Sequence, residues 1–461
     1  MKNGEKMNSI KVIVNNQKSY FLKGETRDIS FRKKQLTKLY DSIKKHENEI
    51  LIALKSDLNK SEFEAYATEI GMVYEELKFM LKNINSLSKP KRKKSPFVHF
   101  PSKSYEYQDP YGCVLIMSPW NYPFQLTIAP LIGAMSAGNC AVVKPSNYAK
   151  QTSQIILKIL SEFPQEYIAV VEGGRDVNNA ILEEKFDYIF FTGSPKVGRL
   201  VMEKATQHLT PITLELGGKS PCIIDKTAKI DLAAKRVAWG KLLNSGQTCV
   251  APDYIVVHES VKNDFVAALK KYIEKFYGKN PEENPEYPKI INKIHFNRLS
   301  ELINNSENVF GGKINTKTQQ IAPAIIENCE WDSLIMNDEI FGPIFPIISY
   351  NNLDEVITKI NSNAKPLALY CFTESKEVEN KILNSIIYGG GCINDTIVHL
   401  ANPHLSFGGV GESGIGRYHG KESFYTFSHT KSILKRGTFL DINLRYPPFK
   451  DNLKLIKWIM K

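Results

Sequence analysis

Two patterns of apolar residues alternate along the middle of the chain. Short runs in which most residues are apolar predict buried strands at Cys113–Met117, Cys140–Lys144, Ile168–Glu172, Tyr188–Thr192 and Thr210–Leu216. Between these runs, apolar residues recur at helical spacing, as at about 150–162 and from Lys196 onwards. Apolar strands that alternate with helices form a parallel sheet covered on both faces. The sequence therefore predicts an α/β fold.

The flanking regions carry different patterns. Residues 28–88 place apolar side chains at helical spacing and predict long helices, in which we find no candidate for chemistry. Ser102–Gln108 and the tail from Ser428 each contain an alternating polar strand, which suits an exposed edge or a subunit contact. In the second half, Leu232–Leu243 is helix-like and Tyr254–His258 is strand-like.

Length and charge limit the classes of protein to which this chain can belong. A chain of 461 residues, 42% of them hydrophobic, can bury a large core and should divide into two or three domains. The net charge of +11 is spread along the chain, and only Lys89–Lys94 forms a basic cluster. A diffuse surplus is typical of a solvated surface. We therefore expect no nucleic-acid partner.

The cysteines and apolar runs predict a cytoplasmic protein, and the histidines predict no metal site. Seven scattered cysteines without a Cys-x-x-Cys pair indicate reduced thiols. No apolar run reaches the roughly 18–20 residues that span a bilayer, and the polar N-terminus lacks the apolar core of a signal peptide. The nine histidines show no ligand constellation, so we expect no catalytic metal.

Polar residues follow four of the predicted strands. Ligands of parallel sheets bind beyond the carboxyl ends of the strands. This rule predicts one crevice, formed by Ser118–Asn121, Lys144–Asn147, Thr192–Ser194 and Glu215–Gly218.

Three residues are candidates for the chemistry itself. Cys249 lies among small and polar residues after a helix, where a thiol could act as a nucleophile, although a lone cysteine is often a small buried hydrophobe. Glu215 ends an apolar strand, where a carboxylate pairs with a cation or serves proton transfer. Asn121 could stabilise an oxyanion, or it could simply form a turn beside proline.

Six motifs, in this order, resemble those of the aldehyde dehydrogenase superfamily. They are Pro119–Pro123, Lys144–Ser146, Phe191–Ser194, Leu214–Gly218, Gly246–Cys249 and Glu339–Pro343. Tyr107–Leu115 and the Arg445–Pro448 tail resemble the class 3 branch, which acts on fatty and aromatic aldehydes. The resemblance implies a Rossmann-like cofactor domain, an α/β catalytic domain and a small bridging element that makes a homodimer.

The resemblance also implies a mechanism. Cys249 would attack an aldehyde, and Asn121 together with the Cys249 N–H would hold the resulting oxyanion. Hydride transfer would leave a thioester, which Glu215 would hydrolyse by activating water. Relatives that pass the acyl group to coenzyme A typically lack this glutamate, so a free acid is expected. An acylating or semialdehyde-specific relative, or a catalytically silent protein on the same fold, is the alternative.

The cofactor would be NAD, with NADP use also expected. The residues implied to bind it are Trp120, Lys144, Asn147, Gly193, Ser194, Gly198, Leu216, Glu339 and Phe341. Taken alone, the Gly193–Gly198 spacing is a weak signal, since a plain turn has the same pattern. NAD-preferring relatives usually carry a glutamate where this chain has Asn147, and a neutral amide would not repel a 2′-phosphate, while Lys144 could pair with one.

The remaining predictions concern packing and domain limits. Tyr122 and Phe407 either line the aldehyde tunnel or pack in the core, and Cys392 falls in an expected structural loop at Gly389–Asp395. Cys113, Cys140, Cys222 and Cys371 are expected in the core. We expect a cofactor-binding domain at 1–94 and 109–215, a catalytic domain at 216–394 and bridging segments at 95–108 and 395–461.

Overall fold

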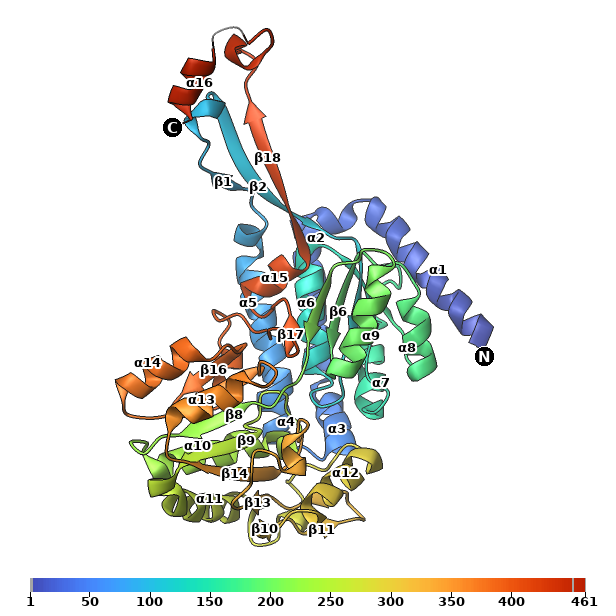
Figure 1. Ribbon diagram of the computed structural model, residues 1–461. Coiled ribbons are helices and arrows are strands. Elements are labelled where there is room, and N and C mark those ends of the chain that lie inside the picture. Colours follow the sequence, from blue (N-terminus) through green and yellow to red (C-terminus); the bar gives the residue numbers. More distant parts are fainter. Residues whose placement is uncertain (1–2, 450–451, 461) are drawn as a thin grey trace.

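The computed structural model describes residues 3–449 and 452–460, with two large sheets and a projecting arm (Figure 1). The first large sheet has six strands in the order β17-β7-β6-β3-β4-β5, and all but β17 run parallel to their neighbours. The strands are β3 (Cys113–Met117), β4 (Cys140–Lys144), β5 (Ile168–Val170), β6 (Tyr188–Thr192), β7 (Ile212–Glu215) and β17 (Gly414–Ile415).

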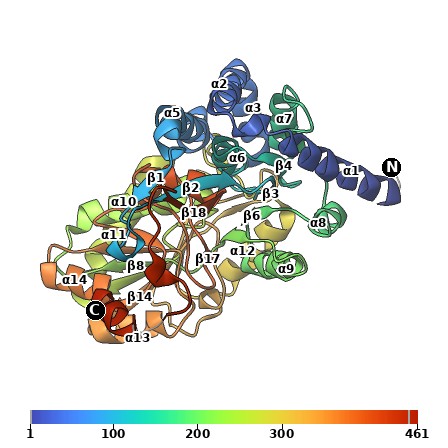
Figure 2. The same ribbon diagram turned by 90° about the horizontal axis from the view of Figure 1, so that it is seen from above.

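Both faces of this sheet are buried under helices, as the apolar strand pattern predicted. On β3, Val114 and Ile116 pack into one apolar cluster, while Cys113, Leu115 and Met117 pack into another. Figure 2 shows the helices of the first cluster on one side of these strands and α8 and α9 on the other. The covering helices are α1 (Asn3–Leu22), α2 (Ile29–Lys45), α3 (Glu47–Leu58), α5 (Gly71–Leu87), α6 (Gln125–Ala137), α7 (Lys150–Leu160), α8 (Arg175–Leu182) and α9 (Pro195–Thr206).

The second large sheet has seven strands, and only the edge strand β10 is antiparallel to its neighbour. In spatial order they are β10 (Val309–Gly311), β13 (Ala324–Ile326), β14 (Ile344–Tyr350), β9 (Tyr254–His258), β8 (Pro221–Ile224), β15 (Ala368–Phe372) and β16 (Gly390–Ile393). Helices α10 (Ile230–Leu242), α11 (Lys262–Tyr277), α12 (Lys293–Asn304), α13 (Leu353–Asn361) and α14 (Lys376–Ser385) accompany it, and β11 (Ile314–Asn315) and β12 (Gln320–Ile321) form a separate pair.

The interpretation of Gly389–Asp395 as a loop was wrong. Gly390–Ile393 is strand β16, which pairs in parallel with β15 at the edge of the second sheet. The glycines hid it, because glycine is depleted in strands and gives no apolar pattern. Here the close packing requires it: a Cβ on Gly391 would fall on the carbonyl oxygen of Leu369.

The arm is a three-stranded antiparallel sheet of β1 (Lys91–Lys93), β2 (Ser102–Pro110) and β18 (Ser428–Arg436). The two long strands are the predicted polar ones, and they pair over nine residues, from Ser428 with Pro110 to Arg436 with Ser102. The tail ends in the short helix α16 (Leu453–Ile459). Part of 395–461 lies elsewhere, since β17 joins the six-stranded sheet and α15 (Lys421–Thr426) packs against α6.

Among the described residues, no helix is long and apolar enough to cross a bilayer. Residues 28–88 form the predicted helices, with one irregularity. Between α4 (Glu62–Ala65) and α5, Tyr66–Ile70 forms a π-helical turn. Such wide turns occur often at functional sites.

Candidate active site

Cys249 lies on a sharply turned segment that follows α10. Asn244 and Ser245 both adopt left-handed backbone angles, with φ of 52° and 53°. Gln247 anchors the segment: its amide nitrogen donates to the carbonyl of Lys289 over 3.0 Å, and its amide oxygen accepts the N–H of Ile291 over 3.1 Å. Cys249 itself is partly buried.

The structure brings Asn121 to this same segment. Asn121 is 3% exposed, and its Nδ2 donates to the carbonyl oxygen of Gln247 over 3.1 Å. In the other direction, the side-chain amide of Asn244 donates a hydrogen bond to the main-chain carbonyl of Asn121 over 2.7 Å. The hydroxyl of Tyr122 lies 2.6 Å from the Thr248 hydroxyl. The amide and the thiol therefore lie on two loops that are fastened to each other.

Glu215 ends β7 and is also 3% exposed. Neither of its carboxyl oxygens has a hydrogen-bond partner among the described residues. Burial raises the pKa of this carboxyl well above its ordinary value. A buried carboxyl left without a partner is costly for the fold, and such groups concentrate at functional sites.

Cys249 lies within the electrostatic reach of two carboxylates. Burial raises the pKa of the Cys249 thiol to about 12, and the charges of Glu339 and Glu215 add to the rise. The main-chain N–H groups of Cys249 and Val250 act in the opposite direction, because they favour negative charge on the sulfur. The thiol is therefore protonated at neutral pH in the free chain, and its reaction requires a proton acceptor.

Unsatisfied polar atoms line the carboxyl ends of three adjacent strands of the six-stranded sheet. Ser118 follows β3, Thr192 ends β6 and Glu215 ends β7. The hydroxyl oxygens of the first two residues and both carboxyl oxygens of Glu215 are buried without a hydrogen-bond partner in the described structure. Gly198 is close-packed, since a Cβ there would lie 2.7 Å from Leu216 Cδ2. Ser194 immediately precedes α9 and makes no side-chain capping bond. This edge therefore fits a polar ligand such as a dinucleotide.

Lys144 and Asn147 follow the neighbouring strand β4. Burial lowers the pKa of the Lys144 ammonium to about 8, although the nearby Glu172 opposes this. Its Nζ donates to the carbonyl of Pro145 over 2.9 Å. Asn147 is exposed and lies near Gly174. A buried lysine of this kind gains from any anionic partner.

Glu339 and Phe341 reach the site from the second sheet. A Cβ on Gly217 would fall on the Glu339 carboxylate, so that carboxylate lies against the chain just after Glu215. Phe341 adopts a left-handed φ of 50°, and its ring meets that of Trp120 edge-on, with centroids 5.3 Å apart. Burial, assisted by the charge of Asp253, raises the pKa of Glu339 to about 8.

Three further residues hold the Glu339 loop and were missed in the sequence. Lys219 pairs with Asp253 over 2.6 Å and donates to the carbonyl of Asp338 over 2.9 Å. Asp253 accepts the N–H of Ile340, and Arg298 donates to the Ile340 carbonyl over 2.6 Å. Lys219 and Asp253 adjoin the motifs of Glu215 and Cys249, but nothing in the sequence indicates that they converge on residues 338–340.

The aromatic residues expected in the aldehyde tunnel pack against residues around the site. Phe407 packs against the same apolar cluster as Cys249, and its ring meets that of Tyr418 edge-on at 5.8 Å. Tyr418, another residue that the sequence did not indicate, is buried and interacts electrostatically with both Glu215 and Cys249. The four cysteines expected in the core are all buried in strands: Cys113, Cys140, Cys222 and Cys371.

The aldehyde dehydrogenase family matches the chain over residues 4–433, and the protein belongs to that family. It is an NAD(P)-dependent aldehyde dehydrogenase of the class 3 type. Over 458 residues it is 47% identical to 4,4′-diaponeurosporen-aldehyde dehydrogenase of Staphylococcus aureus (strain NCTC 8325 / PS 47), covering 99% of this chain and 100% of the relative.

Two mammalian relatives and one solved structure agree with this assignment. Aldehyde dehydrogenase family 3 member A2 of Mus musculus is 44% identical, over 94% of this chain and 90% of the relative. A Canis lupus familiaris enzyme named "Aldehyde dehydrogenase, dimeric NADP-preferring" is 41% identical, over 96% and 98%. The substrate-bound state of Staphylococcus aureus AldH superposes with a TM-score of 0.97 at 47% identity, over 98% and 99%.

The described residues contain no group of three or more His, Cys, Asp or Glu side chains that could hold a metal ion.

Proposed function

We propose that Cys249, Asn121 and Glu215 carry the aldehyde oxidation. The Cys249 thiol gives its proton to the ionised form of Glu215, and its sulfur bonds to the carbonyl carbon of the aldehyde. The carbonyl oxygen becomes an alkoxide, stabilised by Asn121 Nδ2 and the N–H of Cys249. When bound, the oxidised nicotinamide supplies the hydride acceptor. Loss of hydride from the carbon leaves a thioester on Cys249.

Glu215 then acts a second time. After losing the first proton to solvent, its carboxylate takes a proton from water, and the water oxygen attacks the thioester carbon. The carbon–sulfur bond then breaks, the carboxylic acid is released, and the Cys249 thiolate takes back a proton from Glu215. The observation that carries this proposal is a buried carboxyl whose two oxygens have no hydrogen-bond partner among the described residues and which lies within electrostatic reach of the thiol. A raised pKa suits a group that must accept and release protons near neutral pH.

Glu215→Gln tests this assignment. The amide keeps the shape of the side chain but cannot accept the proton of water, so steady-state turnover should fall about 10²- to 10⁴-fold, the usual contribution of a general base. Hydrolysis should slow more than acylation, because the thiol can also lose its proton to solvent, so acyl-enzyme should accumulate on Cys249 and add the acyl mass in intact-protein mass spectrometry. Cys249→Ala is the control that cannot be acylated. Turnover of Glu215→Gln at the parent rate would exclude the role of Glu215 as the base.

The nucleotide site is proposed to use Trp120, Lys144, Asn147, Gly193, Ser194, Gly198, Leu216, Glu339 and Phe341. Lys144 and Asn147 support use of NADP alongside NAD, because the lysine can pair with a 2′-phosphate and the neutral amide does not repel one. The dog relative that is named NADP-preferring agrees with this.

The substrate is proposed to be an apolar aldehyde. Tyr122 and Phe407 would line its path to Cys249, and the Staphylococcus aureus relative is named for a diaponeurosporen aldehyde. Ranking straight-chain and aromatic aldehydes by kcat/KM tests this proposal. A preference for short charged semialdehydes would contradict it.

Domain limits, assembly and location complete the proposal. We assign residues 1–94 and 109–215 to cofactor binding, 216–394 to catalysis and 95–108 with 395–461 mainly to bridging. The long exposed strand β18 and the relative named dimeric support a homodimer. Seven free cysteines, five of them buried, support a reducing, cytoplasmic location.

A further inference from the structure

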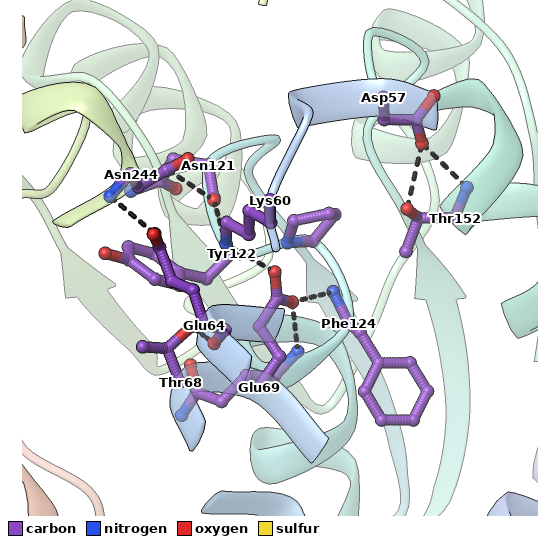
Figure 3. Close-up of polar contacts among 12 residues, drawn as sticks. Asp57, Lys60, Glu64, Thr68, Glu69, Asn121, Tyr122, Phe124, Thr152 and Asn244 are labelled. Atoms are coloured by element: carbon purple, nitrogen blue, oxygen red, sulfur yellow. Dashed lines mark hydrogen bonds and ion pairs between the residues drawn. The ribbon is translucent and has the colours of Figure 1, made fainter. Parts of the chain in front are cut away.

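The helices at residues 47–87 reach into the active site, although their sequence carries no catalytic motif. Figure 3 shows Lys60, Glu64 and Glu69 directed at the two loops that carry Asn121 and Asn244. All three side chains are buried, and Lys60 and Glu69 are 0% exposed. Buried ionisable groups are rare unless they are paired.

Lys60 and Glu69 form an ion pair that holds the Asn121 loop. Their charged atoms are 2.6 Å apart, and Lys60 Nζ also donates to the carbonyl of Asn121 over 3.1 Å. The same ammonium lies 3.9 Å from the centre of the Tyr122 ring, a cation–π contact. The other oxygen of Glu69 accepts the N–H groups of Phe124, over 2.8 Å, and Gln125, over 3.2 Å. The pair therefore holds the loop on both sides of Tyr122.

Glu64 holds the other loop. Its Oε1 accepts the main-chain N–H of Asn244 over 2.6 Å, at a residue in the left-handed conformation. Asn244 lies five residues before Cys249, and its side chain bonds to the Asn121 carbonyl that Lys60 also contacts. That carbonyl oxygen is thus the point at which the two anchored loops meet.

The π-helical turn explains how both acids reach the site. In a regular α-helix, residues five apart point about 140° away from each other. Tyr66–Ile70 lies between Glu64 and Glu69, and its wider winding reduces this angle. Thr68 ties the turn to Glu64 by donating to the Glu64 carbonyl over 2.7 Å.

We propose that Lys60, Glu64 and Glu69 are positioning residues for the reaction. They fix the Asn121 amide relative to the Cys249 segment, so that both can contact the carbonyl group of one substrate molecule. The inference rests on the proposed role of Asn121 as the oxyanion donor. Misplacing such a donor by about 1 Å lowers turnover by as much as about 10²-fold.

The double variant Lys60→Met/Glu69→Gln tests the inference without leaving a lone buried charge. We expect kcat to fall about 10- to 100-fold, with nearly unchanged nucleotide binding and thermal unfolding. The matched control is Lys78→Met/Glu75→Gln, which removes an exposed ion pair from α5 and should leave kcat at the parent value. If the double variant does not fold, Glu64→Gln tests the same inference with one substitution, at the residue that accepts the N–H of Asn244.

Combining each variant with Asn121→Ala distinguishes positioning from general support of the fold. If Lys60 and Glu69 act through the amide, their loss should lower kcat less than about twofold once the amide is gone, because residues that act as one unit are not additive. Full additivity, or parent kcat in both Lys60→Met/Glu69→Gln and Glu64→Gln, overturns the inference. If Asn121→Ala alone keeps the parent activity, Asn121 is not the oxyanion donor, and the proposed function on which the inference rests fails instead.

Discussion

At the scale of single residues, the site contains two acids whose burial raises their pKa values. Glu215 gains no hydrogen bond from the described residues, and Glu339 is held where burial raises its pKa to about 8. The family resemblance identified both residues as candidates. It could not indicate their protonation, because desolvation depends on what packs around the carboxyl in the folded chain.

Glu215 should make stability depend on pH. The unfolded chain ionises this residue above about pH 4.3, whereas burial raises the pKa of the carboxyl well above its ordinary value in the folded chain. Its contribution to stability is therefore fully present below that pH, and it falls by up to about 1.4 kcal/mol per pH unit as pH rises toward the raised pKa.

Glu215→Gln, which does not titrate, should escape this loss. The Tm of the variant minus that of the parent should grow between pH 5 and pH 8 in thermal scans. Glu75→Gln, at an exposed position, is the control and should give a flat difference. A Glu215→Gln difference that stays constant with pH would show that the carboxyl is ionised in the folded protein.

Asn147 should control the choice of nucleotide. In Asn147→Glu, a carboxylate would repel a 2′-phosphate but could accept bonds from ribose hydroxyls, so kcat/KM for NADP should fall at least about tenfold relative to NAD. Asn147→Gln keeps the charge at zero and should retain the parent ratio. Undetectable NADP turnover by the parent enzyme would contradict the proposal at the outset.

At the scale of elements, the turn after α10 is the most constrained backbone near the thiol. Gly246 has φ of 76°, and a Cβ there would fall on the carbonyl of Gly342, which follows Phe341. The Cys249 segment and the Glu339 loop therefore touch backbone to backbone. A side chain at this point would separate the nucleophile from one of the proposed cofactor loops.

Gly246→Ala should accordingly lower both stability and turnover. Strain from the left-handed angle alone costs about 1–2 kcal/mol, and the clash adds to it. Gly24→Ala is the matched control, since Gly24 has φ of 83° with nothing within 4 Å, and it should lose only the strain. Comparing Tm and kcat of the two variants checks this, and equal losses would mean that the contact with Gly342 is unimportant.

Four strands with a strong apolar pattern were predicted with correct limits, whereas β5 and β7 are shorter than predicted and strands defined by tertiary pairing were missed. β3, β4, β6 and β9 begin and end where the apolar runs do. β16 and β17 are glycine-rich, so their sequences carry no strand pattern, and only neighbouring strands determine their conformation. The π-helical turn at Tyr66–Ile70 was also hidden, because its residues continue an ordinary helical sequence.

At the scale of the whole molecule, the site lies where separate parts of the chain meet. The six-stranded sheet supplies Glu215, the segment after α10 supplies Cys249, and the N-terminal helices support Asn121. Sequence motifs predicted the first two contributions. They missed the third, because hydrogen bonds to main-chain atoms, such as that from Lys60 to the Asn121 carbonyl, place no requirement on the residue type of the acceptor.

The arm leads to the prediction for assembly. β18 pairs with β2 on one side only, and in the described chain its other edge pairs with no strand over nine residues. A long unpaired edge readily adds a strand from a second chain. Light scattering should therefore give about twice the chain mass of 52.3 kDa.

Proline substitutions in β18 can locate the contact, because neighbouring N–H groups of a strand point to opposite edges. Of Ser432→Pro and Ile433→Pro, one removes a donor toward β2 and the other a donor toward the free edge. The variant that loses the donor toward the free edge should be monomeric while its arm still folds. Ser432→Ala and Ile433→Ala keep the N–H donor and should remain dimeric. If both proline variants stay dimeric, the subunits associate through another surface. A monomeric parent would instead mean that the arm serves a single chain.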